Sequence, residues 1–136
     1  MVKKLEGKVA VITGASSGIG KSIVEKYVEE GAKVVAFARN FSALKKLEAT
    51  YLGQVKAVAG DVTRQEDLEH LVREAIQAFG GVDIVIPNAG IARVVSFEES
   101  TAEAFSTQFS VNLFGAAETA RLFVPHIRKG GSIQFI

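Results

Sequence analysis

A short run of glycine and serine residues is the part of this sequence best suited to chemistry. Residues 13–20 (TGASSGIG) separate an apolar run from a stretch with helical spacing. The start of a helix offers unpaired backbone N–H groups and the positive end of the helix dipole. Glycine also lets the backbone approach a ligand without a Cβ in the way. The pattern therefore predicts a phosphate-binding loop. Its residues are Gly14, Ser16, Ser17, Gly18, Ile19 and Gly20.

Two other interpretations of this loop are open. Residues 15–22 (ASSGIGKS) end as a nucleoside triphosphate loop does, although alanine replaces its first glycine. Such a loop also needs an acid that holds magnesium directly after an apolar strand, and only Asp61, which follows Gly60, comes close. Alternatively, the glycines serve only tight packing between a strand and a helix. We favour a dinucleotide site, because other residues in the chain agree with it.

The residues about 20 positions beyond the loop indicate which dinucleotide is preferred. A site for NAD(H) places an acid there, which holds the two ribose hydroxyls. Here the sequence has Arg39 and Asn40. A guanidinium makes charge-assisted hydrogen bonds with the 2′-phosphate of NADP(H), which a carboxylate would repel. We therefore expect these two residues to favour NADP(H) over NAD(H), although an exposed surface arginine is the simpler alternative.

Short apolar runs that alternate with helical patterns must position these groups. We predict strands at 8–13, 33–38, 55–59, 82–86 and 132–136, and helices at 22–30, 42–50, 66–79 and about 101–129. Strands that are apolar on both faces and separated by helices indicate a parallel sheet covered on each side. The sequence therefore predicts a doubly wound α/β fold, with Pro125 kinking the long helix or marking its last turn.

Composition and charge limit the remaining possibilities. The chain has 136 residues, is 48% hydrophobic and carries a formal net charge of +1. This composition predicts one domain over residues 1–136, and the mixed charges give no basic patch for nucleic acid. The absence of cysteine excludes a disulfide framework and a thiolate metal site. No apolar run reaches the roughly 18 residues of a membrane span, so we expect a cytoplasmic protein without membrane contact or metal.

Four motifs together resemble those of the classical short-chain dehydrogenase/reductase family, and the resemblance covers essentially all 136 residues. It implies a Rossmann-type, three-layer α/β/α fold with five parallel strands in the order 3-2-1-4-5. The motifs are T-G-x-x-x-G-I-G at 13–20, Asp61 with Val62 and Thr63, Asn88 with Ala89 and Gly90, and Asn112 within 111–115. Pro87 departs from the family pattern, as does Ser17, where many NADP-binding relatives have a basic residue.

The resemblance also implies roles for these residues. Asp61 and Val62 would lie beside the adenine, although Asp61 could equally cap a turn near Thr63. The backbone of Asn88, Ala89 and Gly90 would approach the ribose; the alternative is a simple turn.

The family's catalytic groups are almost all missing from this sequence. Relatives use a tyrosine, a lysine four residues later, a serine and a helix asparagine, and only the asparagine has a counterpart, Asn112. The two tyrosines, Tyr27 and Tyr51, are not followed by lysine at that spacing. His70 and His126 are better explained as surface residues. We expect the cofactor-binding half of such an oxidoreductase, ending after strand five and inactive alone.

The predicted end of the sheet suggests self-association. The edge of strand five carries β-branched residues, and the helix at 101–129 carries several phenylalanines. Both are surfaces that tend to bind another chain. We expect a homo-oligomer through one of these two surfaces. Two further possibilities are an active NADP-dependent carbonyl reductase when a C-terminal half is supplied, and a purely structural oligomer that binds no nucleotide.

Overall fold

The structure is a computed structural model that describes residues 2–136. Its centre is a five-stranded parallel sheet with the strand order β3-β2-β1-β4-β5. The strands are β1 (Val9–Thr13), β2 (Lys33–Ala38), β3 (Val55–Ala59), β4 (Val82–Ile86) and β5 (Ile127–Ile133). The predicted strand order and parallel topology are confirmed, and the bounds of the second, third and fourth strands agree with the prediction.

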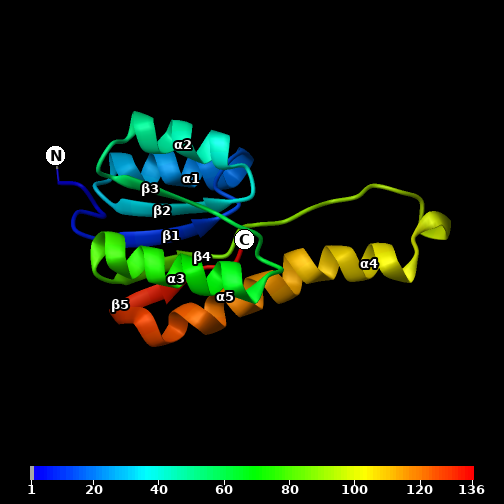
Figure 1. Cartoon of the computed structure of the whole chain (residues 1–136). Helices are drawn as coiled ribbons and strands as arrows, with labels where there is room; N and C mark the ends of the chain where they lie inside the picture. Colours follow the sequence, from blue (N-terminus) through cyan, green and yellow to red (C-terminus); the bar gives the residue numbers. More distant parts are fainter. Residues whose placement is uncertain (1) are drawn as a thin grey trace.

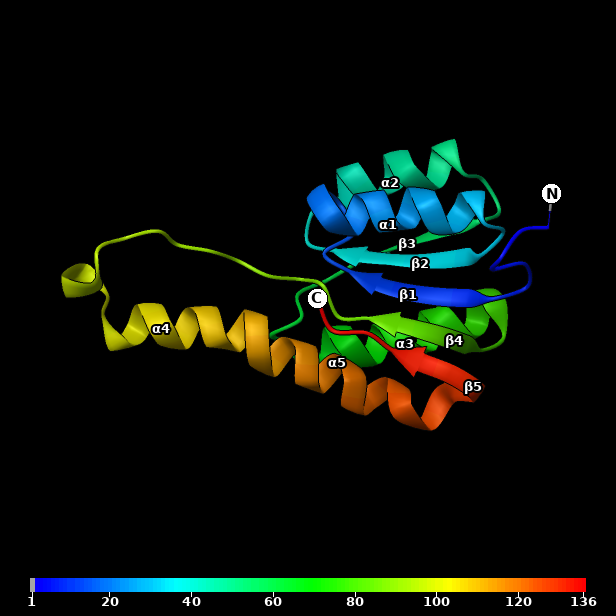
Figure 2. The same ribbon diagram turned by 180° about the vertical axis from the view of Figure 1, so that it is seen from behind.

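Helices cover both faces of this sheet. In two opposite views, α1 and α2 lie on one face and α3 and α5 on the other (Figure 1, Figure 2). The helices are α1 (Gly18–Glu29), α2 (Phe41–Thr50), α3 (Gln65–Phe79), α4 (Ala102–Phe109) and α5 (Ala116–Phe123). Among residues 2–136, no helix has the length and apolar character needed to cross a membrane.

Two apolar clusters make up the core, one on each side of the sheet. Strand residues of β1 and β2 alternate between them, because successive side chains of a strand point to opposite faces. Ile12, Val34 and Ala36 pack toward α1 and α2, whereas Val11 and Val35 pack toward α3 and α5. These strands are apolar on both faces because helices cover both faces. The three-layer architecture expected from the sequence is thereby confirmed.

The long helix predicted at 101–129 is not continuous. After α4, the backbone forms a π-helical turn (Ser110–Gly115, the π-turn), continues as α5, and ends in a 3-10 turn (Val124–His126). Pro125 lies in this 3-10 turn, which agrees with the prediction that it marks the last turn of the helix. A further 3-10 turn, Phe97–Glu99, was not predicted. It lies at the tip of an arm, formed by residues 91–101 and α4, that extends away from the sheet (Figure 1, Figure 2).

The predicted start of the fifth strand, at residue 132, was wrong. β5 begins at Ile127, which pairs with Val82, and a register irregularity separates this pair from the pairing of Ser132 with Ile84. Gly130 and Gly131 lie inside this irregular part of the strand. Beyond β5, backbone pairing with β4 continues, because Gln134 N donates to the Val85 carbonyl at 2.9 Å.

A buried carboxylate fastens this early part of β5 to the sheet. Asp83 in β4 is 6% exposed, and its Oδ2 accepts hydrogen bonds from the Val9 backbone N–H at 2.8 Å and from Arg128 Nη1 at 3.1 Å. The guanidinium of Arg128 lies against the backbone of Gly81, where a Cβ would come within 2.6 Å of Nη2. The Asp83–Arg128 contact therefore explains why the strand starts five residues before its predicted position.

Replacing Asp83 with alanine should destabilise the fold markedly. The change leaves the buried Val9 N–H without its acceptor and Arg128 without its counter-charge, which costs about 3 kcal/mol. Urea unfolding measures the free energy. As a control, Glu118→Ala removes the surface ion pair with Arg121 and should leave the unfolding midpoint nearly unchanged. Equal midpoints for the two variants would contradict the proposed anchoring role.

Candidate functional site

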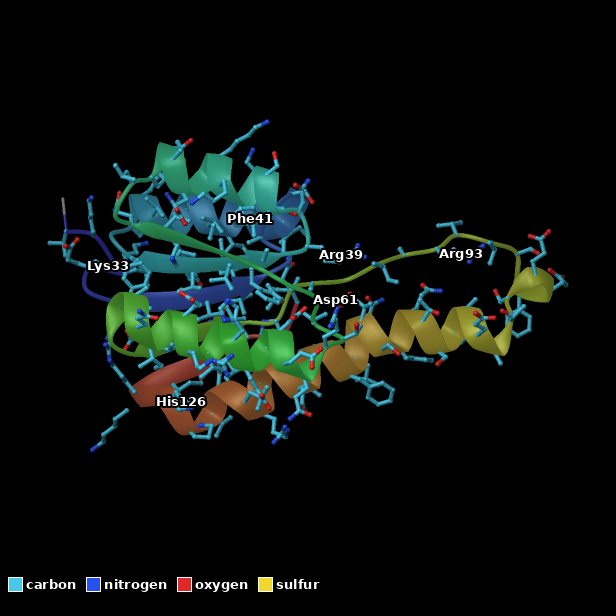
Figure 3. All side chains as sticks on the ribbon, viewed as in Figure 1. Lys33, Arg39, Phe41, Asp61, Arg93 and His126 are labelled. Atoms are coloured by element: carbon cyan, nitrogen blue, oxygen red, sulfur yellow. The ribbon has the colours of Figure 1, made fainter. Side chains whose placement is uncertain are left out.

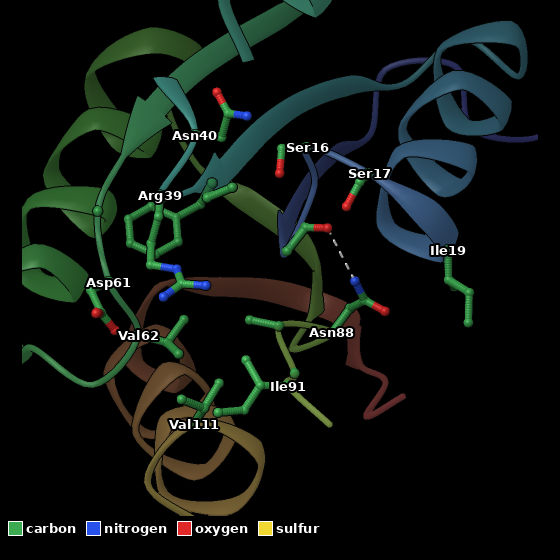
Figure 4. Close-up of a pocket in the computed structure, with 16 residues that line it drawn as sticks. Ser16, Ser17, Ile19, Arg39, Asn40, Asp61, Val62, Asn88, Ile91 and Val111 are labelled. Carbon is green, nitrogen blue, oxygen red and sulfur yellow. Dashed lines mark hydrogen bonds between the residues drawn. The ribbon is translucent and has the colours of Figure 1, made fainter. Parts of the chain in front are cut away.

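A pocket of about 360 Å³ lies at the carboxyl ends of the central strands (Figure 4). This is the edge of a doubly wound sheet at which ligands usually bind. The lining comes from the loops that follow β1, β2, β3 and β4, together with the last two residues of β2, one residue of α1 and one of the π-turn. The lining residues are Gly14, Ser16, Ser17, Ile19, Phe37, Ala38, Arg39, Asn40, Gly60, Asp61, Val62, Asn88, Ala89, Gly90, Ile91 and Val111.

The glycine loop is packed closely against the chain segment after β4. Gly14 has a φ of +65°, and a Cβ there would come within 2.8 Å of the Ala89 Cα. A Cβ on Gly20 would overlap the Gly14 carbonyl oxygen and come within 2.6 Å of Asn88 Nδ2. Two of the three loop glycines are therefore required by close approach within the protein, and this close approach shapes one wall of the pocket.

Asn88 and Thr13 hold these two segments together. The Thr13 hydroxyl accepts hydrogen bonds from the backbone N–H groups of Asn88 and Ala89, both at 3.0 Å. The side chain of Asn88 donates from Nδ2 to the carbonyls of Thr13 at 3.1 Å and Gly14 at 3.4 Å (Figure 4). The sequence indicated only that the Asn88 backbone would approach a ligand. Its side chain also fixes the glycine loop, a role that sequence analysis missed.

The N-terminus of α1 has no acceptor of its own. Ser17 is the N-cap residue, but its side chain makes no capping hydrogen bond, and the first turn contains no acid. In contrast, Asn40 caps α2 by accepting from the Ala43 N–H at 3.1 Å, and Thr101 caps α4. Unpaired N–H groups at the positive end of a helix attract an anion. The start of α1, at the pocket rim, can therefore receive a phosphate group.

Asp61 adds a carboxylate to the opposite side of the pocket. Its Oδ1 accepts hydrogen bonds from the Thr63 N–H at 2.9 Å and from the Thr63 hydroxyl at 2.8 Å, so the predicted turn-capping role is present. Partial burial works to raise the pKa of Asp61, but the hydrogen bonds from Thr63 and the positive charge of Arg39 outweigh it and leave the pKa below its ordinary value. Within residues 2–136, Oδ2 receives no hydrogen bond and is open to a donor.

Arg39 brings a positive charge to the same pocket. It follows the last residue of β2 and extends across the pocket from the end of that strand (Figure 4). Arg39 and Asp61 lie at one end of the sheet, whereas Lys33 and His126 lie toward the other (Figure 3). The pocket thus combines an anion-attracting helix end, a guanidinium and a carboxylate, which suits a ligand with several phosphates and a hydrogen-bond donor.

Asn112 lies beside the pocket rather than in its lining. Its Oδ1 accepts from the Ile91 N–H and its Nδ2 donates to the Ile91 carbonyl, both at 2.8 Å. Asn112 belongs to the π-turn, and such turns often mark functional positions in helices. Its side chain therefore holds Ile91 in the pocket wall.

Most of the predicted site residues meet in this pocket. Eleven of the thirteen predicted binding residues are in the lining, whereas Gly18 and Gly20 are not. The structure adds apolar lining residues that the sequence did not single out, namely Phe37, Ala38, Gly60, Ile91 and Val111. Among the residues described, 2–136, no cluster of three or more histidine, cysteine, aspartate or glutamate side chains could hold a metal ion.

Comparisons with known proteins agree with this geometry. The family model described as short chain dehydrogenase matches residues 8–136. L-fucose dehydrogenase of Mus musculus is 40% identical over 129 residues, which are 94% of this chain and 47% of that protein. The chain thus spans about half the length of this curated relative.

Two solved structures are also similar. The 3-ketoacyl-(acyl-carrier-protein) reductase from Brucella melitensis, complexed with NADH, has a TM-score of 0.87 and 35% identity, over 90% of this chain and 51% of that one. The alcohol dehydrogenase from the archaeon Thermococcus sibiricus, complexed with 5-hydroxy-NADP, has a TM-score of 0.88 and 32% identity, over 94% of this chain and 57% of that one.

Proposed function

Because this chain belongs to the short-chain dehydrogenase family, we propose that its pocket binds NADP(H) in preference to NAD(H). The proposal rests mainly on one observation: Arg39 lines the same pocket as the loop that leads into the uncapped start of α1. The pyrophosphate would bind at this helix start, and the 2′-phosphate would bind the Arg39 guanidinium.

Further features of the pocket suit the rest of the dinucleotide. The open Oδ2 of Asp61 would accept a hydrogen bond from the adenine amino group, with Val62 beside the ring. The ribose on the nicotinamide side would lie along Asn88, Ala89 and Gly90. Both NADH and an NADP derivative are bound by similar proteins, so the relatives do not choose between the two. The choice is proposed from Arg39, because no acid lies at the end of β2 to hold a free 2′-hydroxyl.

We propose that this chain binds the cofactor without turning over substrate by itself. The cofactor supplies a hydride, and the protein must supply a proton donor near the carbonyl that is reduced. Tyr27 and Tyr51 pack against the core cluster beneath α1 and α2 and do not line the pocket. Asn112 is the only family catalytic residue with a counterpart here, and its hydrogen bonds with Ile91 suit a positioning role. Carbonyl reduction is proposed only for an assembly that supplies the tyrosine, lysine and serine.

Self-association is part of this proposal. Phe105, Phe109 and Leu113 recur every four residues along α4 and the π-turn and are between 42% and 52% exposed. β5 is the last strand in the strand order β3-β2-β1-β4-β5, and its outer edge is the second surface that we propose for contact with another copy. Sedimentation velocity measures the expected homo-oligomer, and a monomer at high concentration would argue against it. The cytoplasmic location and the single domain over 1–136 stay predictions.

Calorimetric titration with NADPH, NADH and MgATP tests the proposed function. We expect NADPH to bind about tenfold or more tightly than NADH, since one charge-assisted contact contributes about 1.5–3 kcal/mol. MgATP should bind weakly, because the triphosphate interpretation lacks its magnesium-holding acid. Binding of MgATP without either dinucleotide would overturn the proposal, and binding of none of the three would favour the purely structural oligomer.

A further inference from the structure

The wall of the pocket next to Asp61 is fixed by a carboxylate that lies outside the pocket. Asp67, in the first turn of α3, accepts a hydrogen bond at Oδ2 from the backbone N–H of Asp61 at 2.9 Å. Asp67 is partly buried and is not among the lining residues. Asp67 is the third residue of α3, yet the N–H from which its carboxylate accepts belongs to a residue that precedes the N-cap Arg64. The Asp67 carboxylate thus bonds to the loop that carries Asp61, rather than to the start of its own helix.

The same loop is held on its other side by β2. Gly60 N–H donates to the Ala38 carbonyl at 3.0 Å, immediately before Arg39. Gly60 is also enclosed between two side chains, because a Cβ there would come within 2.7 Å of the Phe37 ring and 2.9 Å of the Asp67 Cβ. The loop after β3 therefore has little freedom between β2 and α3. Asp67 supplies the polar contact on the α3 side.

We propose that Asp67 is a positioning residue for the adenosine end of the bound dinucleotide. Its hydrogen bond fixes the backbone of Asp61, a lining residue, so that Thr63 occupies Oδ1 of Asp61 and Oδ2 is left for the adenine amino group. This inference rests on the proposed dinucleotide site and adds a residue to it. Asp67 is bonded to the loop after β3, whereas the nicotinamide-side ribose is proposed to lie along the segment after β4, which is fastened to Thr13 instead.

A positioning role predicts an effect on one half of the ligand only. Asp67→Ala should weaken binding of 2′-phospho-ADP-ribose, the adenosine half, about tenfold, which corresponds to one lost hydrogen bond. Binding of reduced nicotinamide mononucleotide, the other half, should stay within about twofold. Asp67→Asn keeps an acceptor oxygen in the same place and should restore most of the affinity. NMR titration measures both halves and also reports the amide signal of Asp61, which should shift more in the alanine variant than in the asparagine variant.

Glu66→Gln is the matched control, since it removes a neighbouring first-turn acid that pairs with Arg64 and makes no bond to the loop. It should leave the affinity for both halves unchanged. Equal weakening of both halves by Asp67→Ala would mean a general structural role and overturn the inference, as would unchanged binding of 2′-phospho-ADP-ribose. If Asp67→Ala does not fold, the folded Asp67→Asn variant decides. Because this variant keeps the acceptor oxygen, a loss of its affinity for 2′-phospho-ADP-ribose would also overturn the inference. Failure of the unaltered chain to bind NADPH refutes the proposed function first, and the inference with it.

Discussion

Replacing Arg39 with aspartate is expected to reverse the dinucleotide preference of this chain. The change removes the charge-assisted hydrogen bonds to the 2′-phosphate and puts a like charge in their place. The affinity for NADPH should therefore fall about 100-fold, or by about 2.7 kcal/mol. The affinity for NADH should hold or improve, because a carboxylate at the end of β2 can accept from both ribose hydroxyls. Calorimetric titration of the variant with each dinucleotide measures the two changes.

The same change of charge at a residue outside the pocket should not reverse the dinucleotide preference. Arg73 is exposed on α3 and does not line the pocket, so Arg73→Asp changes the net charge by the same amount at a distant position. It should alter the affinities for NADPH and NADH equally and only slightly, through screened long-range repulsion. If the Arg39 and Arg73 variants lose NADPH affinity to the same extent, the general charge of the protein decides the preference and not a contact at Arg39.

The central strands could be predicted well because their sequence signal is local and strong. β2, β3 and β4 are short apolar runs with helical stretches between them, so composition and periodicity give their bounds to the residue. The first helix was less accurate: it was expected from residue 22, but α1 begins at Gly18. Its opening turn is made of glycine and isoleucine rather than of an apolar stripe, so periodicity could not reveal it.

The start of β5 depends on contacts between distant residues, which a local pattern does not contain. Residues 127–131 include two adjacent glycines and charged residues, a composition that signals the end of a helix rather than a strand. The contacts that hold this segment on the sheet come from distant residues, above all the carboxylate of Asp83, 45 residues away from Arg128 in the chain. The π-turn escapes prediction for a similar reason, because its apolar spacing fits an ordinary helix.

The sequence motifs identified eleven of the lining residues, whereas five that belong to no motif were missed. Gly14, Arg39 and Asp61 stand out because each has an unusual type for its place at a strand end. Phe37, in β2, and Ile91, after β4, look like ordinary core residues in the sequence, and they line the pocket because the ends of these two strands lie at the same edge of the sheet. Asp67 was missed for the same reason. Its bond to the Asp61 N–H spans a loop whose shape depends on Gly60 and the ring beneath it.

Replacing Gly20 with alanine is expected to abolish dinucleotide binding and to weaken the fold. The new Cβ would overlap the Gly14 carbonyl oxygen, a backbone atom, and press on Asn88 Nδ2, which hydrogen bonds to the Thr13 and Gly14 carbonyls hold in place. The glycine loop must then move away from the segment after β4, which opens the wall of the pocket. We expect the affinity for NADPH to fall more than 100-fold, and the overpacking to cost about 1–3 kcal/mol of stability. Titration with NADPH and urea unfolding measure the two effects.

The control for this variant is a glycine whose replacement by alanine strains the backbone but brings the new Cβ into contact with no other atom. Gly53, in the turn between α2 and β3, has a φ of +81°, and a Cβ added there would meet no atom within 4 Å. Gly53→Ala should therefore cost about 1 kcal/mol through backbone strain alone and leave NADPH affinity unchanged. Because both variants add one methyl group, the difference in binding isolates the close approach of Gly20 to Gly14. Full NADPH affinity in a folded Gly20→Ala variant would mean that the loop can bind phosphate without this close packing.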